Sequence, residues 1–170
     1  MGITDLQVAK LLVSSPSVLT RSVETNLKPK AKWFKDLGLD DSKVAKVLVS
    51  CPSVLTRTVE NLQTKVKWLK DLGMVDLQVA ETVARYPNLL TCSLDKNLKP
   101  EAQALRERGF EDSQLVSLLH GFPRLFGSRA ELLTHRMNVL AAQGLLTEKS
   151  LRNTIALTEA KFAARFESTD

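Results

Sequence analysis

Two histidines are the residues of this chain best suited to acid–base chemistry near neutral pH. They are His120 and His135, and neither belongs to a recognisable nucleophile motif. Glu131 stands four residues before His135, a spacing that fits a surface pair as well as a functional dyad. The stretch GFPRLFG at 121–127 lacks the Gly-Lys-Ser/Thr end of a phosphate-binding loop. The sequence therefore predicts no enzyme.

The two cysteines give no sign of a metal or a disulfide framework. Cys51 and Cys92 have no second pair and no histidine cluster near them. Two small apolar side chains in a reducing compartment explain them better. We expect no metal site and no cofactor.

Basic residues are the more informative set, because their distribution is uneven. The formal net charge of the chain is +5; residues 5–75 hold 12 Lys or Arg against 7 Asp or Glu, whereas residues 76–170 hold 12 of each. Two arginines repeat directly after a Pro-Ser-Val-Leu-Thr stretch. Three lysines share an arc of roughly 60° at helical periodicity, and two of them recur 35 residues later, with Gln63 in the place of Lys28. The candidate phosphate contacts are Arg21, Arg57, Lys28, Lys32, Lys35, Lys67 and Lys70.

A plainer interpretation of these lysines stays open. The polar side of an amphipathic helix is usually just solvated, and i,i+4 partners are available on the same helices. The pairs are Glu24 with Lys28, Lys32 with Asp36, and Lys67 with Asp71.

The elements that position these residues follow from an internal repeat. Prolines stand at 16, 52, 87 and 123, and glycines at 38, 73, 109 and 144, so two independent helix breakers keep a period of 35 or 36 residues. The predicted repeats are 5–40, 41–75, 76–110 and 111–145, and residues 146–170 are predicted to form a C-terminal capping helix.

Each copy predicts the same local structure. An amphipathic helix is ended by a proline, the Pro-x-apolar-apolar segment forms a tight 3₁₀ turn, and a second helix follows. The glycine caps the second helix, and an apolar residue (Leu39, Met74, Phe110 or Leu145) makes the accompanying hydrophobic contact. One such unit cannot cover its own apolar face, so the predicted fold is all-α, an α-solenoid of stacked repeats.

Trp33 and Trp68 are equivalent in the first two repeats and have side chains that could stack on bases. Both flank the apolar arc of their helix, which favours packing between repeats. With so few aromatic residues, recognition of backbone and shape fits better than a single-strand stacking platform.

The best-matching segments are VLVSCPSVLTRTVENLQTKVKWLKDLGM and VARYPNLLTCSLDKNLKPEAQALRERGF, together with IALTEAKFAARF in the tail. In these segments the chain resembles the mitochondrial transcription termination factor (mTERF) family. The resemblance implies a solenoid of helix, helix and 3₁₀ turn, with a groove used for nucleic acid or for partners in organelle gene expression. It favours the phosphate-binding interpretation of the basic residues over the solvated-face interpretation.

The leading hypothesis is a non-enzymatic factor that binds structured RNA (rRNA) or a duplex backbone through its basic N-terminal repeats. RNA is favoured over DNA, and the charge-balanced half is expected to contact protein. The alternative is an architectural subunit of an organellar ribosome or another large assembly, gripping mainly protein. A mitochondrial location is favoured over a plastid. No apolar run reaches the 18 or more residues that a spanning helix needs, so no membrane partner is expected.

Overall fold

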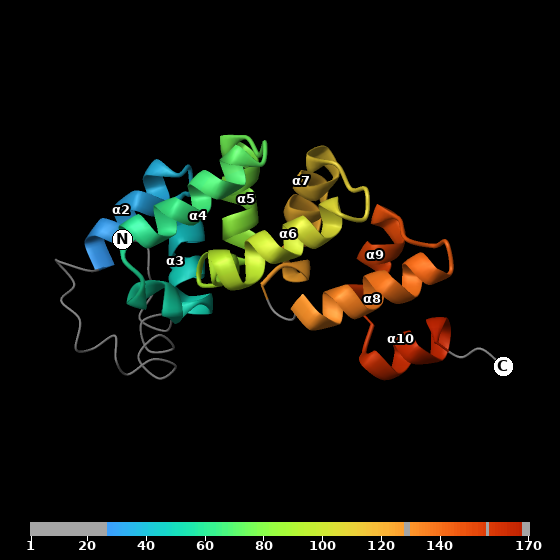
Figure 1. Cartoon of the computed structure of the whole chain (residues 1–170). Coiled ribbons are helices and arrows are strands. Elements are labelled where there is room, and N and C mark those ends of the chain that lie inside the picture. The colour runs from blue at the N-terminus through green and yellow to red at the C-terminus, as the bar shows by residue number, and fades with distance from the viewer. Residues whose placement is uncertain (1–26, 128–129, 156, 168–170) are drawn as a thin grey trace. The chain divides into compact units, whose positions relative to one another are not determined.

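The computed structural model describes residues 27–127, 130–155 and 157–167, and all regular structure in these ranges is helical (Figure 1). The predicted all-α class is therefore confirmed. The chain divides into two compact units, residues 1–91 and 92–170. This division falls inside the third predicted repeat, and the repeat boundaries themselves stay a prediction.

In unit 1, equivalent elements of successive repeats pack on one another. Its elements are α2 (Lys28–Asp36), α3 (Asp41–Ser50), η3 (Pro52–Thr56), α4 (Val59–Asp71), α5 (Asp76–Arg85) and η4 (Pro87–Leu90). First helix packs on first helix (α3 on α5), second on second (α2 on α4), and the 3₁₀ turn η3 packs on η4. The core between them is apolar and fully buried, and its largest members are Phe34, Leu48, Leu62, Leu69, Leu89 and Leu90.

Unit 2 repeats this arrangement. It contains η5 (Leu94–Leu98), α6 (Lys99–Arg106), α7 (Asp112–Gly121), η6 (Pro123–Leu125), α8 (Ala130–Ala142), α9 (Glu148–Ile155) and α10 (Glu159–Phe166). Helix α6 packs on α8, and α7 packs on α9 (Figure 1). The tail thus holds two helices where one was predicted, because Thr158 caps a new helix by accepting a hydrogen bond from the Lys161 amide at 3.3 Å. Helix α9 stands where the first helix of another repeat would stand.

The proline turns form as predicted wherever the structure describes them. Pro52, Pro87 and Pro123 each open a 3₁₀ segment directly after a first helix. A proline lacks the amide that would continue the helix, so the chain tightens there. The two apolar residues of each Pro-x-apolar-apolar segment are buried: Val54 and Leu55, Leu89 and Leu90, Leu125 and Phe126. Pro16 lies outside the described residues.

The glycine caps are also confirmed. Gly38 has φ +101°, its amide donates to the Lys35 carbonyl at 2.9 Å, and the Leu39 amide donates to the Phe34 carbonyl at 3.0 Å. These two bonds define the Schellman motif, and the same pair of bonds recurs at Gly73, Gly109 and Gly144. The apolar residue after the cap is buried in the first three cases, whereas Leu145 is 47% exposed and its carbonyl accepts a hydrogen bond from the Ser150 hydroxyl.

Eight residues before each capping glycine stands a buried ionisable residue, which the sequence analysis did not single out. The four are Lys30, Lys65, Glu101 and Arg136, and each is at most 5% exposed. Lys30 Nζ donates to the Leu55 carbonyl at 2.7 Å, which ties α2 to the proline turn of the next repeat. Arg136 donates to the carbonyls of Thr154 and Leu157, which ties α8 to the tail. We call this position the buried charged slot.

Glu101 places an acidic residue at the buried charged slot, where the other three repeats have a basic one. Its Oε2 accepts a hydrogen bond from the Gly127 amide at 2.6 Å, while Oε1 has no partner among the described residues. Burial raises the pKa of this carboxyl to about 7, and the hydrogen bond from Gly127 opposes part of that shift.

Candidate nucleic-acid interface

Six of the seven predicted phosphate contacts lie on described elements of unit 1, and all six are exposed. Arg21 lies outside the described residues. The rest, which we call the basic set, are Lys28, Lys32 and Lys35 on α2, Arg57 directly after η3, and Lys67 and Lys70 on α4. Because α2 packs on α4, the two lysine stripes stand on neighbouring helices.

Two members of the basic set bridge helix junctions. Lys35 Nζ lies 2.6 Å from Asp41, and Lys70 Nζ lies 2.5 Å from Asp76, so the last turn of a second helix is joined to the start of the next first helix. In unit 2 Arg106 pairs with Asp112 in the same way at 2.7 Å. These pairs are therefore a property of the repeat as well as of the basic half. Exposed pairs of this kind contribute about 0–1 kcal/mol, so a phosphate can compete for the lysines.

The i,i+4 pairs allowed by the sequence form only in part. Lys67 Nζ lies 2.9 Å from the Asp71 carboxylate within α4. Lys32 and Asp36 are not paired, and neither has a polar partner among the described residues. The predicted Glu24–Lys28 pair cannot be placed, because Glu24 lies outside those residues.

Arg57 lies directly after the proline turn η3. One guanidinium nitrogen donates to the Thr91 carbonyl at 3.2 Å, so the side chain runs from the end of η3 to the end of η4. A guanidinium has five N–H donors, and the contact with Thr91 uses one. The exposed remainder of the fork can still meet an anion.

Two further lysines of the basic half are not available to a ligand. Lys30 and Lys65 are 3% and 5% exposed and belong to the buried charged slot. Lys65 Nζ contacts Asn61 Oδ1 at 2.5 Å, one turn earlier in α4. A pattern in the sequence could have identified them, since each lies three residues after an apolar residue, Leu27 or Leu62, and four before a buried one, Phe34 or Leu69.

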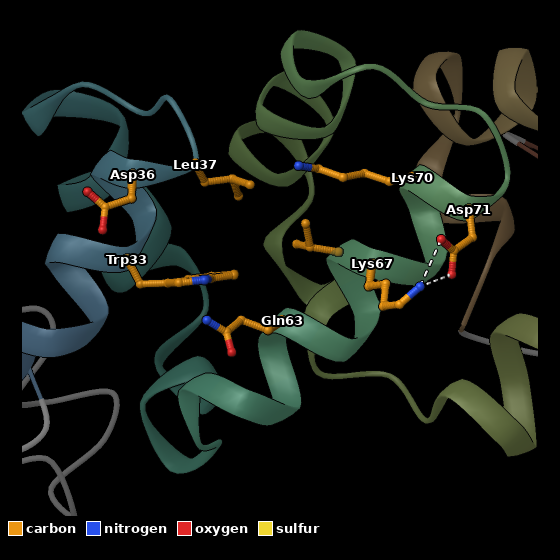
Figure 2. Close-up of a pocket in the computed structure, with 8 residues that line it drawn as sticks. Trp33, Asp36, Leu37, Gln63, Lys67, Lys70 and Asp71 are labelled. Atoms are coloured by element: carbon orange, nitrogen blue, oxygen red, sulfur yellow. Dashed lines mark hydrogen bonds and ion pairs between the residues drawn. The ribbon is translucent and has the colours of Figure 1, made fainter.

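An open groove of about 490 Å³ lies between α2 and α4. Figure 2 shows Trp33 reaching from α2 toward α4, with Gln63 on one side of the indole and Leu37 and Lys70 on the other. The groove is lined by Trp33, Asp36, Leu37, Gln63, Val66, Lys67, Lys70 and Asp71. It thus combines one half-buried aromatic ring with lysines, carboxylates and an amide.

The histidines considered for catalysis do not form the dyad that their spacing allowed. His135 Nε2 lies 2.6 Å from Glu167 in the tail, and no bond to Glu131 is seen among the described residues. Within those residues no group of three or more His, Cys, Asp or Glu side chains could hold a metal ion.

The fold and this site define an all-α helical-repeat protein with an exposed basic set on unit 1. Residues 1–156 match the model of the mTERF family. The chain belongs to the mTERF family, whose members are organellar, non-enzymatic nucleic-acid-binding factors of gene expression. A search among curated proteins found no match. None of the helices in the described ranges combines the length and apolar character needed to cross a bilayer.

Proposed function

We propose that this protein binds structured RNA inside an organelle through unit 1 and has no catalytic activity. The observation that carries the proposal is the placement of the basic set. The excess positive charge of the chain lies within residues 5–75, and the basic set is exposed there on α2, α4 and the turn after η3. Membership of a nucleic-acid-binding family supports the same assignment.

Recognition in this proposal depends on backbone and shape. Lysines spaced along two packed helices offer point charges to phosphates, and Arg57 offers a planar fork beside them. An RNA fold brings several phosphates together on one surface, which such a set can contact without reading a sequence. Unit 2, which holds 11 Lys or Arg against 10 Asp or Glu, is left to contact protein in the same particle.

A salt titration tests the proposal directly. Neutralising five or six phosphates predicts a slope of log K against log salt of about −4 to −5. The measurement is fluorescence anisotropy of a labelled, folded RNA from 50 to 300 mM salt, with a duplex DNA of equal length in parallel. A slope near zero, or tighter binding of the DNA, would contradict binding of structured RNA.

Charge-reversal variants test whether the basic set is the surface that binds RNA. Arg57→Glu and Lys32→Glu should each weaken binding and flatten the salt slope by about one or more, because each turns a phosphate contact into a repulsion. Lys161→Glu is the matched control, since it makes the same charge change on the exposed face of α10 in unit 2. Equal losses in all three variants would show that net charge alone is measured and would remove the assignment to unit 1.

The cellular form of the proposal is tested by sedimentation. We expect the native protein in an organelle extract, mitochondrial in our proposal, to sediment with a ribonucleoprotein particle and to be released by ribonuclease. Retention after ribonuclease treatment and a high-salt wash would instead support the architectural alternative, in which unit 2 and the rest of the chain grip protein.

A further inference from the structure

The groove between α2 and α4 does not have the charge of a simple phosphate site. Lys67 is paired with Asp71 and Lys70 with Asp76, so both of its lysines already have carboxylate partners. Asp36 lines the same groove and has no polar partner among the described residues. A phosphate entering beside Asp36 would meet an unscreened negative charge, whereas a group with N–H donors would meet an acceptor.

An aromatic surface lines the same groove. Trp33 is half-buried, one turn before Leu37 on α2, and its indole extends into the groove between Gln63 and Lys70 (Figure 2). The Trp33 and Phe34 rings form a T-shaped pair with centroids 4.9 Å apart. A nucleobase is the part of an RNA that offers both a flat face for stacking and N–H donors at its edge.

We propose that this groove receives one unstacked guanine of the RNA, with the base on the indole of Trp33 and its donor edge toward Asp36. Guanine is the choice because its N1–H and N2–H point the same way, so one carboxylate can accept both. The O6 and N7 acceptors at its other edge can share the ammonium group of Lys67 or Lys70 with its carboxylate partner, since an ammonium has three N–H donors. The inference rests on the proposed function, since it names a subsite within that RNA-binding surface. At about 490 Å³, the groove lies within the roughly 300–1,000 Å³ common for small-ligand sites.

Trp33 itself supplies the readout. The chain has two tryptophans, so Trp68→Phe leaves Trp33 as the single reporter. The probes are two RNA hairpins of one sequence, one with a single bulged guanine and one fully paired, and a third with an abasic bulge. We expect the guanine bulge to quench Trp33 emission and to bind more tightly than the other two hairpins.

Substitutions in the groove test the two contacts separately. Trp33→Leu should weaken binding of the guanine-bulged hairpin by about 5- to 150-fold, the range seen when a stacking partner is lost, and should leave the paired hairpin unchanged. Trp33→Phe should retain part of the preference and guards against a folding defect, which far-ultraviolet circular dichroism would also report. Asp36→Asn should remove the preference for guanine over inosine, which lacks the N2 amino group, whereas Asp95→Asn on η5 is the control for the charge change.

The outcomes separate this inference from the proposed function. Failure of every hairpin to bind would overturn the proposed function. Binding of all three hairpins with equal affinity and no change in Trp33 emission would overturn the guanine site alone. Equal affinity for guanine and inosine bulges in the unsubstituted protein would overturn the role of Asp36.

Discussion

At the scale of single residues, the buried charged slot shows how the neighbouring backbone determines what an ionisable group does. Lys30 and Arg136 donate to main-chain carbonyls, while Glu101 accepts from a main-chain amide. A buried charge without partners costs several kcal/mol, roughly, so each of these side chains persists only because a peptide group meets it. Their removal should therefore cost more than the removal of exposed charges nearby.

Lys30→Met should lower the free energy of unfolding by about 1–3 kcal/mol, because the Leu55 carbonyl loses its buried donor. Lys32→Met on the same helix is exposed and should change it by less than about 0.5 kcal/mol. The measurement is chemical denaturation of both variants at one pH. In the RNA assay the order should be reversed: Lys32→Met should weaken binding and Lys30→Met should not, since Lys32 belongs to the basic set and Lys30 does not. Equal effects on stability would show that the Lys30 contact is not stabilising.

Glu101 carries a pH dependence whose sign follows from its raised pKa. The folded carboxyl titrates at about 7 and the unfolded one near 4.5, so the folded state binds more protons between these values. The contribution of this group to stability is present below about pH 4.5 and is lost as the pH rises through 7. Ionisation of a group that is only 2% exposed is the physical cause.

Glu101→Gln removes that titration while its amide oxygen can keep the hydrogen bond from Gly127. Relative to the unsubstituted protein, the variant should therefore gain about 1–3 kcal/mol of stability between pH 5 and pH 8. Denaturation curves at the two pH values measure the gain, and comparing one protein with the other cancels any constant cost of the new amide. If the difference in unfolding free energy between the two proteins is the same at pH 5 and pH 8, the raised pKa of Glu101 is contradicted.

At the scale of elements, the ends of helices and turns hold the repeats in register. Gly127 lies two residues after η6 with φ +87°, and a Cβ placed on it would lie 2.3 Å from Cys92 Sγ. The Cys92 thiol also donates to the Gly127 carbonyl at 3.3 Å. The link before η5 and the turn after η6 are therefore in direct contact, with no room for another atom.

Gly127→Ala and Gly109→Ala separate backbone strain from collision. Gly109 has the same φ of +87°, and nothing lies within 4 Å of a Cβ placed on it. Gly109→Ala should cost about 1–2 kcal/mol from the left-handed backbone alone, whereas Gly127→Ala should cost a further 1–3 kcal/mol, roughly, from overpacking. Thermal denaturation of the two variants measures the difference. Equal costs would mean that the Cys92 side chain moves aside freely.

Most of these elements could be predicted from the sequence, because they depend on local chemistry. Pro52 and Gly73 act on their own turns, and the predicted 3₁₀ segment and Schellman cap follow from them directly. Contacts that depend on the next repeat could not be predicted in the same way. The Lys35–Asp41 pair crosses a helix junction, and Lys30 reaches a carbonyl 25 residues away, so neither follows from i,i+4 spacing. The groove could not be predicted either, because it exists only once α2 packs on α4.

At the scale of the whole molecule, the two units can be observed separately. Both tryptophans, Trp33 and Trp68, lie in unit 1, so tryptophan emission reports that unit, while circular dichroism reports helices of both. In unit 2 the tail is held to α8 by Arg136, which donates to two tail carbonyls and lies 5.0 Å from the centre of the Phe162 ring. Burial lowers the pKa of Arg136 from its ordinary value, and Glu159 opposes the shift.

Arg136→Met should destabilise unit 2 by about 2–5 kcal/mol, because two carbonyls and one ring lose their cation. On heating, part of the circular dichroism signal should then be lost before tryptophan emission changes. Arg165→Met on α10 is the control: Arg165 is exposed and contacts the neighbouring Phe166 ring at 5.3 Å. Coincident transitions, both shifted to lower temperature, would show that the tail also supports unit 1.

The reversed polarity of the slot at Glu101 has a consequence for anyone who wishes to engineer the array. A consensus sequence taken by majority over the four copies would place a cation at every such position. At the third copy that cation would face the amide hydrogen of Gly127, where the first copy offers the oxygen of Leu55. The copies are therefore not interchangeable building blocks, and an idealised version of this protein must transplant each slot together with the turn that it holds.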